Sequence, residues 1–247
     1  MERTELIMGM PITVAIPPTG GAEPPDSAFA AVWDWFREVD LRYSPYKPDS
    51  EVSRISRGEL PPAQASAGMR EIIRMCDETA AISDGYFSAW FEGRFDPSGL
   101  VKGWAIGQAS TILEGLGFPN HCIEAGGDIE VKGFNKQGLP WEIGIRNPRD
   151  TATIIKVLKL SGRGIATSGT YIRGRHIYNP KTGQRVEGVP SLSVVGPTIY
   201  EADRLVTAAY AMGDSGINWL MAKPGIDVYQ VGHDGKALYT PGLARYL

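Results

Sequence analysis

The sequence predicts an α+β fold in which helices cover a mostly antiparallel or mixed β-sheet. Four segments carry apolar residues at helical spacing, and the stretch between the third and the fourth has strand character interrupted by turn signals. Hydrophobic residues make up 43% and charged residues 21% of the 247 residues, which is ordinary for a globular protein with a sizeable core. Because there is no internal repeat, low-complexity tract or clear boundary, we expect one domain over residues 1–247.

The first part of the chain is predicted to hold one strand and two helices. Residues 12–16 form the strand, and the Pro/Gly-rich residues 17–25 form a loop. The first helix covers residues 27–43, and its apolar stripe consists of Phe29, Val32, Trp33, Phe36 and Val39. Residues 40–54 are polar and punctuated by proline, which favours an ordered loop. The second helix covers residues 66–83, with a stripe of Met69, Ile72, Ile73, Cys76 and Ala80.

The second part is predicted to be mostly strands between two further helices. A third helix carries apolar residues from Ala105 to Leu116 and stops at Gly117. The predicted strands lie, in chain order, at 121–125, 129–132, 141–145, 154–160, 164–168 and 192–195. The fourth helix covers about residues 201–212, a short helix begins near Asp214, and a hairpin turns at residues 233–235.

Charge and composition exclude several classes of function. The net charge of −3 and the absence of a basic run argue against a nucleic-acid-binding surface. Cys76 and Cys122 lie far apart in apolar surroundings, so we expect two free thiols in a reducing compartment. Neither a signal peptide nor an apolar run of membrane-spanning length is present, and the expected location is cytoplasmic.

The segment from Asp96 to Ile106 is the strongest candidate for a phosphate site. It places Lys102 near the start of a helix, between two glycines, where exposed backbone N–H groups and the helix dipole favour an anion. The alternative from this segment alone is a loop before a core helix, with Lys102 in solvent. The common nucleotide motifs, G-x-G-x-x-G after a strand and G-x-x-x-x-G-K-[ST], do not occur.

Taken together, eight short segments resemble the FAD:protein FMN transferases, the ApbE flavin transferase family. They occur in family order along most of the chain: Met8-Gly9, residues 43–46 with 50–54, 84–87, 96–105, 126–128, 166–169, 176–183 and 202–208. The resemblance implies the ApbE-like α+β fold and FAD as the flavin substrate.

The resemblance also implies a divalent metal, Mg²⁺, beside the FAD diphosphate. Its ligands are expected to be the Asp203 carboxylate, the Thr207 hydroxyl and backbone carbonyls of Gly99 and Val206. These are hard oxygen donors of the kind Mg²⁺ prefers, and Asp203 and Thr207 are four residues apart on one predicted helix face. We expect that face to be exposed. The alternative is that Thr207 packs in the helix while Asp203 is solvated or caps it.

The flavin-binding residues implied by the resemblance come from five segments. They are Met8, Tyr46, Tyr86, Phe87, Ser88, Asp96, Lys102, His176 and Ile177. Lys102 is expected to neutralise diphosphate charge, Tyr46 to contact the FAD from a proline-fixed loop, and Asp96 to accept hydrogen bonds from it. Tyr86 is equally consistent with core packing.

The implied reaction is transfer of FMN from FAD to a threonine or serine hydroxyl of an acceptor protein, with release of AMP. His176 is the expected base for the acceptor hydroxyl, while Asp203 and Thr207 act through the metal. Two alternatives remain: a metal-dependent FAD hydrolase that gives FMN and AMP, and a non-catalytic FAD-binding or carrier protein. The sequence does not identify the acceptor.

Several positions depart from the family pattern. They are Ser56, Ser88, Gly107, Glu124 and Asn179, and the stretch between Phe87 and Asp96 is shorter than usual. Family members commonly have carboxylates at the positions of Ser88, Gly107 and Asn179. These departures bear on acceptor handling more than on FAD binding.

Overall fold

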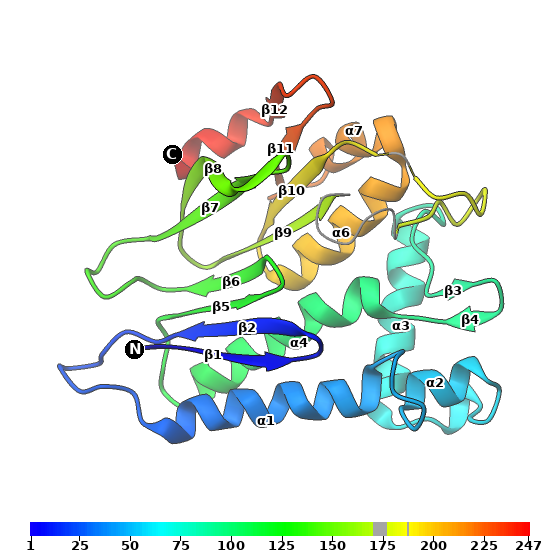
Figure 1. The fold of residues 1–247 in the computed structure, drawn as a ribbon, viewed down its shortest axis with the longest axis horizontal. Coiled ribbons are helices and arrows are strands. Elements are labelled where there is room, and N and C mark those ends of the chain that lie inside the picture. Colours follow the sequence, from blue (N-terminus) through cyan, green and yellow to red (C-terminus); the bar gives the residue numbers. More distant parts are fainter. Residues whose placement is uncertain (170–176, 187) are drawn as a thin grey trace.

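The computed structural model describes residues 1–169, 177–186 and 188–247, and it confirms the α+β prediction (Figure 1). Its main feature is an eight-stranded sheet with the order β1-β2-β5-β6-β9-β10-β11-β12, in which every neighbouring pair is antiparallel. The strands are β1 (Glu2–Ile7), β2 (Met10–Ala15), β5 (His121–Ala125), β6 (Asp128–Lys132), β9 (Arg163–Gly169), β10 (Ser191–Gly196), β11 (Asp227–Val231) and β12 (Ala237–Tyr239). This sheet therefore joins strands from near both ends of the chain.

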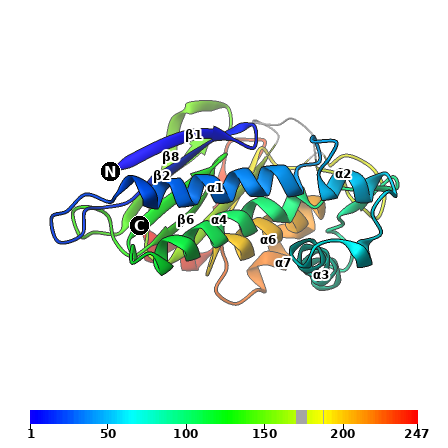
Figure 2. The same cartoon turned by 90° about the horizontal axis from the view of Figure 1, so that it is seen from below.

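Helices cover one face of the sheet, as predicted (Figure 2). The long helices are α1 (Asp26–Tyr43), α3 (Ala67–Ile82), α4 (Ser98–Gly115) and α6 (Ile199–Ala211). Shorter helical turns are α2 (Glu51–Ser56), η1 (Pro62–Gln64), η2 (Gly213–Ser215), α7 (Gly216–Met221) and η3 (Pro241–Tyr246). Each of the five residues predicted as the apolar stripe of α1 is buried. Within the described residues, no helix combines the length and apolar character needed to cross a bilayer.

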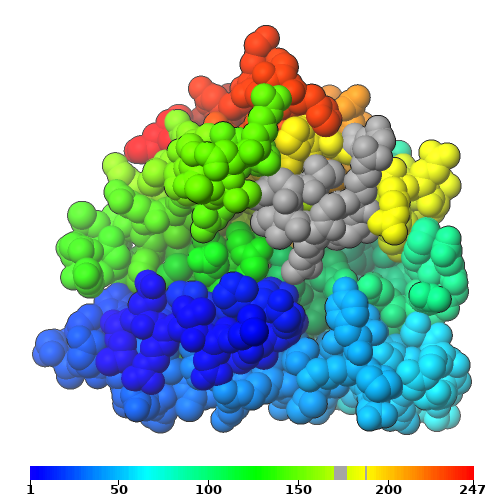
Figure 3. Space-filling model, in the orientation of Figure 1, coloured from blue at the N-terminus to red at the C-terminus, as the bar shows by residue number. Residues whose placement is uncertain are grey.

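A β-hairpin made of β7 (Trp141–Asn147) and β8 (Asp150–Leu160) covers part of the opposite face. Figure 3 shows this face, with the green hairpin above the blue N-terminal strands. Strand β10 is buried along its whole length because it lies between both coverings. Leu192 and Val194 enter the core on the helical side, while Val195 enters a second core with Leu158 and Leu160 of the hairpin.

The structure corrects four element predictions. Strand β1 was missed; it lies at the edge of the sheet, and its polar sequence with only Ile7 buried carries no alternation of apolar and polar residues. Residues 40–54 are not all loop, because α2 begins at Glu51 after Ser50, whose side chain accepts the N–H of Ser53 as an N-cap. Helix α4 begins at Ser98, so Lys102 lies within the helix, and β8 begins four residues earlier than predicted.

A further small hairpin joins β3 (Trp90–Phe91) to β4 (Arg94–Phe95) between α3 and α4. It was not predicted, because two-residue strands carry no periodicity. Ser56 of α2 anchors it by accepting the N–H of Phe95 at 3.1 Å. The hairpin thereby forms one wall of the cavity described next.

Candidate functional site

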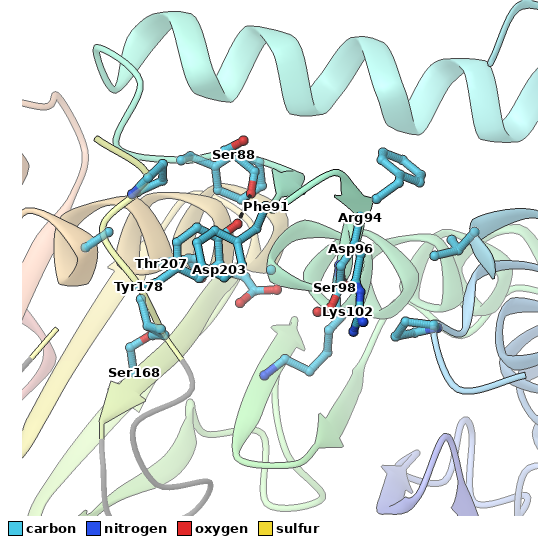
Figure 4. Close-up of a pocket in the computed structure, with 18 of the residues that line it drawn as sticks. Ser88, Phe91, Arg94, Asp96, Ser98, Lys102, Ser168, Tyr178, Asp203 and Thr207 are labelled. Carbon is cyan, nitrogen blue, oxygen red and sulfur yellow. Dashed lines mark hydrogen bonds between the residues drawn. The ribbon is translucent and has the colours of Figure 1, made fainter. Parts of the chain in front are cut away.

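A cavity of about 780 Å³ lies where α2, α4, α6, the β3–β4 hairpin and the end of β9 meet. Figure 4 shows 18 of the residues that line it. The predicted site residues in its wall are Tyr46, Tyr86, Phe87, Ser88, Asp96, Gly99, Lys102, Ile177, Asp203 and Thr207. They come from separate parts of the chain, and the fold brings them to one place.

Three predicted residues are not part of this described lining. Met8 packs against the helical core, at a backbone φ of 56°, and Val206 is buried in that core. His176 lies outside the described residues. Tyr46 is at the rim, where its side chain is 92% exposed and available to a ligand.

Close packing of α4 on α6 sets the position of the central polar residues. A Cβ added to Gly99 would lie 3.1 Å from Thr207 Cγ2, and one added to Gly103 would lie 2.6 Å from Asp203 Cβ. Glycines four residues apart on α4 therefore face residues four apart on α6. The close approach of the two helices leaves no room for a side chain at Gly103, and it brings the backbone of α4 into contact with the Asp203 carboxylate.

Asp203 is buried, with 4% of its surface exposed, so the expectation of an exposed helix face was wrong. The reason is that α6 packs against α4 and also against β9 and β10 of the sheet, so the face that carries Asp203 is covered by α4. Asp203 Oδ2 accepts the backbone N–H of Gly103 at 2.7 Å. In a regular helix that N–H bonds the carbonyl of Gly99, so the carboxylate competes with Gly99 for this donor.

The pKa of Asp203 is raised to about 7, mainly by burial and further by the Asp128 carboxylate, although the Lys102 ammonium and the Gly103 N–H oppose the rise. Lys102 forms an ion pair with Asp128 Oδ2, and Asp128 is only 1% exposed. Two buried carboxylates therefore share the neighbourhood of one ammonium group. Asp128 was not among the predicted site residues, although the Gly126-Gly127-Asp128 turn was noticed.

Aromatic side chains also line the cavity. The rings of Phe91 and Tyr178 lie 3.7 Å apart between centroids, and the Tyr178 hydroxyl donates to the Ser88 carbonyl at 3.3 Å. Lys181 Nζ donates to Asp84 Oδ2 at 2.6 Å and lies 4.2 Å from the centre of the Tyr86 ring. These contacts tie residues 177–186 to the segment after α3. Phe91 and Tyr178 were missed because no pattern in the sequence marks them.

Arginines also line the cavity and were missed by the sequence analysis: Arg57, Arg94 and Arg185. Arg57 is paired with Glu59 at 2.6 Å, which offsets its charge at the rim. A wall that combines arginine and lysine with aromatic rings suits a ligand that carries both phosphate and planar groups.

Besides Ser56, two further departures from the family pattern have local structural roles. The Ser88 hydroxyl donates to the Trp90 carbonyl at 2.8 Å and accepts the Trp90 N–H, which shapes the entry to β3. Asn179 Oδ1 accepts the Lys181 N–H at 2.9 Å and so forms the turn that an aspartate would form.

The donor set around Asp203 fits a hard cation. In the described part of the chain, no three His, Cys, Asp or Glu residues cluster as metal ligands, so a cation here would rely on one carboxylate, neutral oxygens and a substrate. Magnesium is commonly bound in this way, through one or two carboxylates together with phosphate oxygens and water. Thr207 lies beside Gly99 at the cavity wall and adds a hydroxyl.

Comparison with known proteins gives one family. A model of the ApbE family matches residues 8–93 and 90–230. The FAD:protein FMN transferase of Escherichia coli is 29% identical over 155 residues, which are 59% of this chain and 44% of that protein. The Vibrio cholerae protein of the same name is 33% identical over 129 residues, which are 48% of this chain and 39% of that protein. The matched part is thus less than half the length of each of these curated relatives.

Solved structures share the fold. The flavin transferase ApbE from Vibrio cholerae matches with a TM-score of 0.86 at 21% identity, over 100% of this chain and 99% of that one. The ApbE protein from Thermotoga maritima matches with a TM-score of 0.83, also at 21% identity, over 100% of this chain and 98% of that one. Because the family model matches most of the sequence, the chain belongs to the ApbE family.

Proposed function

We propose that this protein transfers the FMN part of FAD to a threonine or serine hydroxyl of an acceptor protein, in a Mg²⁺-dependent reaction that releases AMP. The observation that carries the proposal is the single cavity that gathers ten of the residues predicted from the family resemblance. The names of the relatives, which are FAD:protein FMN transferases, support the same reaction.

The proposed roles follow from position. Asp203 and Thr207 would hold the cation with the Gly99 carbonyl, and the aromatic rings of Tyr46, Phe91 and Tyr178 would contact the planar groups of FAD. Bound Mg²⁺ would supply charge neutralisation at the diphosphate. Lys102 would add a second positive charge next to the phosphates.

The transfer step makes one bond and breaks one bond. The acceptor hydroxyl oxygen bonds to the FMN-side phosphorus, and the P–O bond to the AMP-side phosphate breaks. AMP leaves with the bridging oxygen, and the hydroxyl proton goes to a base. From the sequence alone, we propose His176 as that base.

One assay separates the proposal from its alternatives. Purified protein is incubated with FAD and Mg²⁺, with and without a candidate acceptor, and AMP and protein-linked flavin are measured. A transferase releases AMP in step with flavin attachment, whereas a hydrolase releases AMP and free FMN without an acceptor. A carrier protein binds FAD and releases neither product. Absence of FAD binding at micromolar concentration, with or without Mg²⁺, would refute the entire proposal.

A further inference from the structure

Asp128 is a buried acidic residue at the site that the proposed mechanism does not use. It is the first residue of β6, directly after Gly126 and Gly127, whose φ angles are 59° and 93°. The tight turn fixes its backbone, and Oδ1 accepts the backbone N–H of Thr167 in β9 at 3.1 Å. Its position is therefore set by the sheet and not by the cavity.

The other oxygen of Asp128 pairs with Lys102. The Lys102 side chain is 17% exposed and lines the cavity, whereas the Asp128 side chain is 2% exposed and is not among the described lining residues. Asp203, on α6, belongs to the same cluster: Oδ2 accepts the N–H of Gly103, the residue after Lys102, and a side-chain hydrogen bond with Asp128 contributes to its raised pKa. Figure 4 shows Lys102 and Asp203 reaching into the same part of the cavity. Lys102 and the two carboxylates thus form one cluster, in which Asp128 and Asp203 compete for a single ammonium group.

A lysine that paired with Asp203 would interfere with a cation site. The ammonium group would neutralise the carboxylate that is proposed to bind Mg²⁺, and it would occupy the space of the ion. A lysine stem is flexible, so a second carboxylate is needed to keep it elsewhere.

We propose that Asp128 is a positioning residue that keeps the Lys102 ammonium paired with its own carboxylate instead of with Asp203, so that Asp203 stays available for Mg²⁺ while Lys102 is fixed in the cavity wall. This inference rests on the proposed function, because it assumes the cation at Asp203. If Asp128 served only as the acceptor for the Thr167 N–H in β9, replacing it would lower the melting temperature without changing the Mg²⁺ affinity.

The experiment is a double-mutant cycle read by Mg²⁺ affinity. Asp128→Asn keeps an oxygen for the Thr167 N–H but removes the charge that holds the lysine, and Lys102→Met removes the ammonium with little change in length. Mg²⁺ is titrated into wild type, both single variants and the double variant, at saturating FAD and without FAD. The readouts are the Mg²⁺-induced rise in melting temperature and the heat of binding. Asp84→Asn is the matched control, because that carboxylate is exposed and pairs with Lys181.

The positioning role predicts strong coupling between the two substitutions. Asp128→Asn should weaken Mg²⁺ binding about 10-fold or more, since the released lysine moves onto Asp203. Lys102→Met should then restore affinity about 10-fold in the Asp128→Asn background, but change it less than about 3-fold in wild type. Asp84→Asn should leave Mg²⁺ affinity unchanged.

Three results would overturn the inference. These are an unchanged Mg²⁺ affinity in Asp128→Asn, an equal gain from Lys102→Met in both backgrounds, and a loss of melting temperature without loss of Mg²⁺ affinity. If Asp128→Asn does not fold, Asp128→Ser, which keeps a hydroxyl for Thr167, takes its place with the same expectations. Wild type that binds FAD but no Mg²⁺ would instead refute the proposed cation site, and the inference would fall with it.

Discussion

At Asp203 the fold keeps a carboxylate in surroundings that make its negative charge unfavourable. The side chain is buried and a second carboxylate lies nearby, and both effects outweigh the Lys102 ammonium and the Gly103 N–H, which favour the charged form. Such a group is stabilised when a cation binds. Without the cation, the buried Asp203 carboxylate should therefore contribute little to the free energy of unfolding of the protein.

Asp203→Asn should therefore separate activity from stability. We expect Mg²⁺-dependent AMP release to fall by about two to three orders of magnitude, because the charged metal ligand is lost. The melting temperature of the metal-free protein should change by only a few degrees, since the Asn oxygen can still accept the Gly103 N–H. Asp214→Asn, at an exposed residue of η2, is the control. Wild-type turnover in Asp203→Asn would show that this residue is not a metal ligand.

His121 is a second buried titratable residue, away from the cavity lining. It is 0% exposed, and its ring nitrogens bond the Ser110 hydroxyl at 2.7 Å and the Phe118 carbonyl at 2.8 Å. Burial lowers the pKa of His121, and the Phe118 carbonyl partly opposes this effect. The neutral imidazole is thus the form that the fold stabilises.

The folded protein should lose stability in mild acid for this reason. Below about pH 6.5 the unfolded chain binds a proton at His121 more readily than the folded one, so the free energy of unfolding falls as pH decreases. The contribution is at most about 1.4 kcal/mol per pH unit for one proton. Urea unfolding between pH 7.5 and 5.5 measures the free energy of unfolding of wild type and of His121→Gln. The difference between these two free energies should become smaller as the pH falls. The exposed His233→Gln should keep the wild-type pH dependence; if His121→Gln keeps it too, the histidine is not the titrating group.

At the scale of elements, the crossing of α4 and α6 determines the geometry of the site. Gly99 and Gly103 let the helices approach until the α4 backbone contacts Thr207 and Asp203. Gly107 continues the row, where a Cβ would lie 3.9 Å from Ile199 Cγ2 in ordinary contact. The close packing explains why only glycine fits at Gly103, whereas a larger residue would also fit at Gly107.

Gly103→Ala should force the two helices apart. The new Cβ would meet Asp203 Cβ at 2.6 Å and the Ile199 carbonyl at 3.0 Å, so we expect a loss of about 1–3 kcal/mol in unfolding free energy together with weaker Mg²⁺ binding. Gly115→Ala, at the exposed end of the same helix with no atom within 4 Å, should instead be neutral or stabilise by up to about 1 kcal/mol. Chemical unfolding and Mg²⁺ titration measure both. Equal effects from the two substitutions would contradict a steric role for the crossing.

At the scale of the whole molecule, the sheet separates two cores. The helical core supports the cavity, while the second core lies under the β7–β8 hairpin on the opposite face. The hairpin should therefore contribute to stability without shaping the site.

Leu158→Ala tests this separation. Leu158 is 0% exposed in the second core, so its truncation should cost about 2–5 kcal/mol of unfolding free energy. FAD affinity, measured at a temperature where the variant is folded, should stay within about 3-fold of wild type. The neighbouring Val157, 45% exposed, gives the matched substitution Val157→Ala with a small effect on both. A parallel loss of FAD affinity in folded Leu158→Ala would show that the hairpin shapes the cavity.

The sequence by itself determined the class of fold and most long elements, because helical and strand periodicities are local and strong in α1, α3, β5 and β6. Through family resemblance it also identified ten residues that share the cavity. It missed β1, α2 and the β3–β4 hairpin, which are short or lie at an edge and so carry little periodic signal.

Only the tertiary structure decided the environment of each site residue. The burial of Asp203 follows from the packing of α4 against α6. The pattern of apolar residues along α6 does not reveal that contact. The pairing of Lys102 with Asp128 joins a helix to a strand 26 positions further along the chain. Charge, burial and distance between such residues depend on long-range packing, and they determine the chemistry that the same residue types can perform.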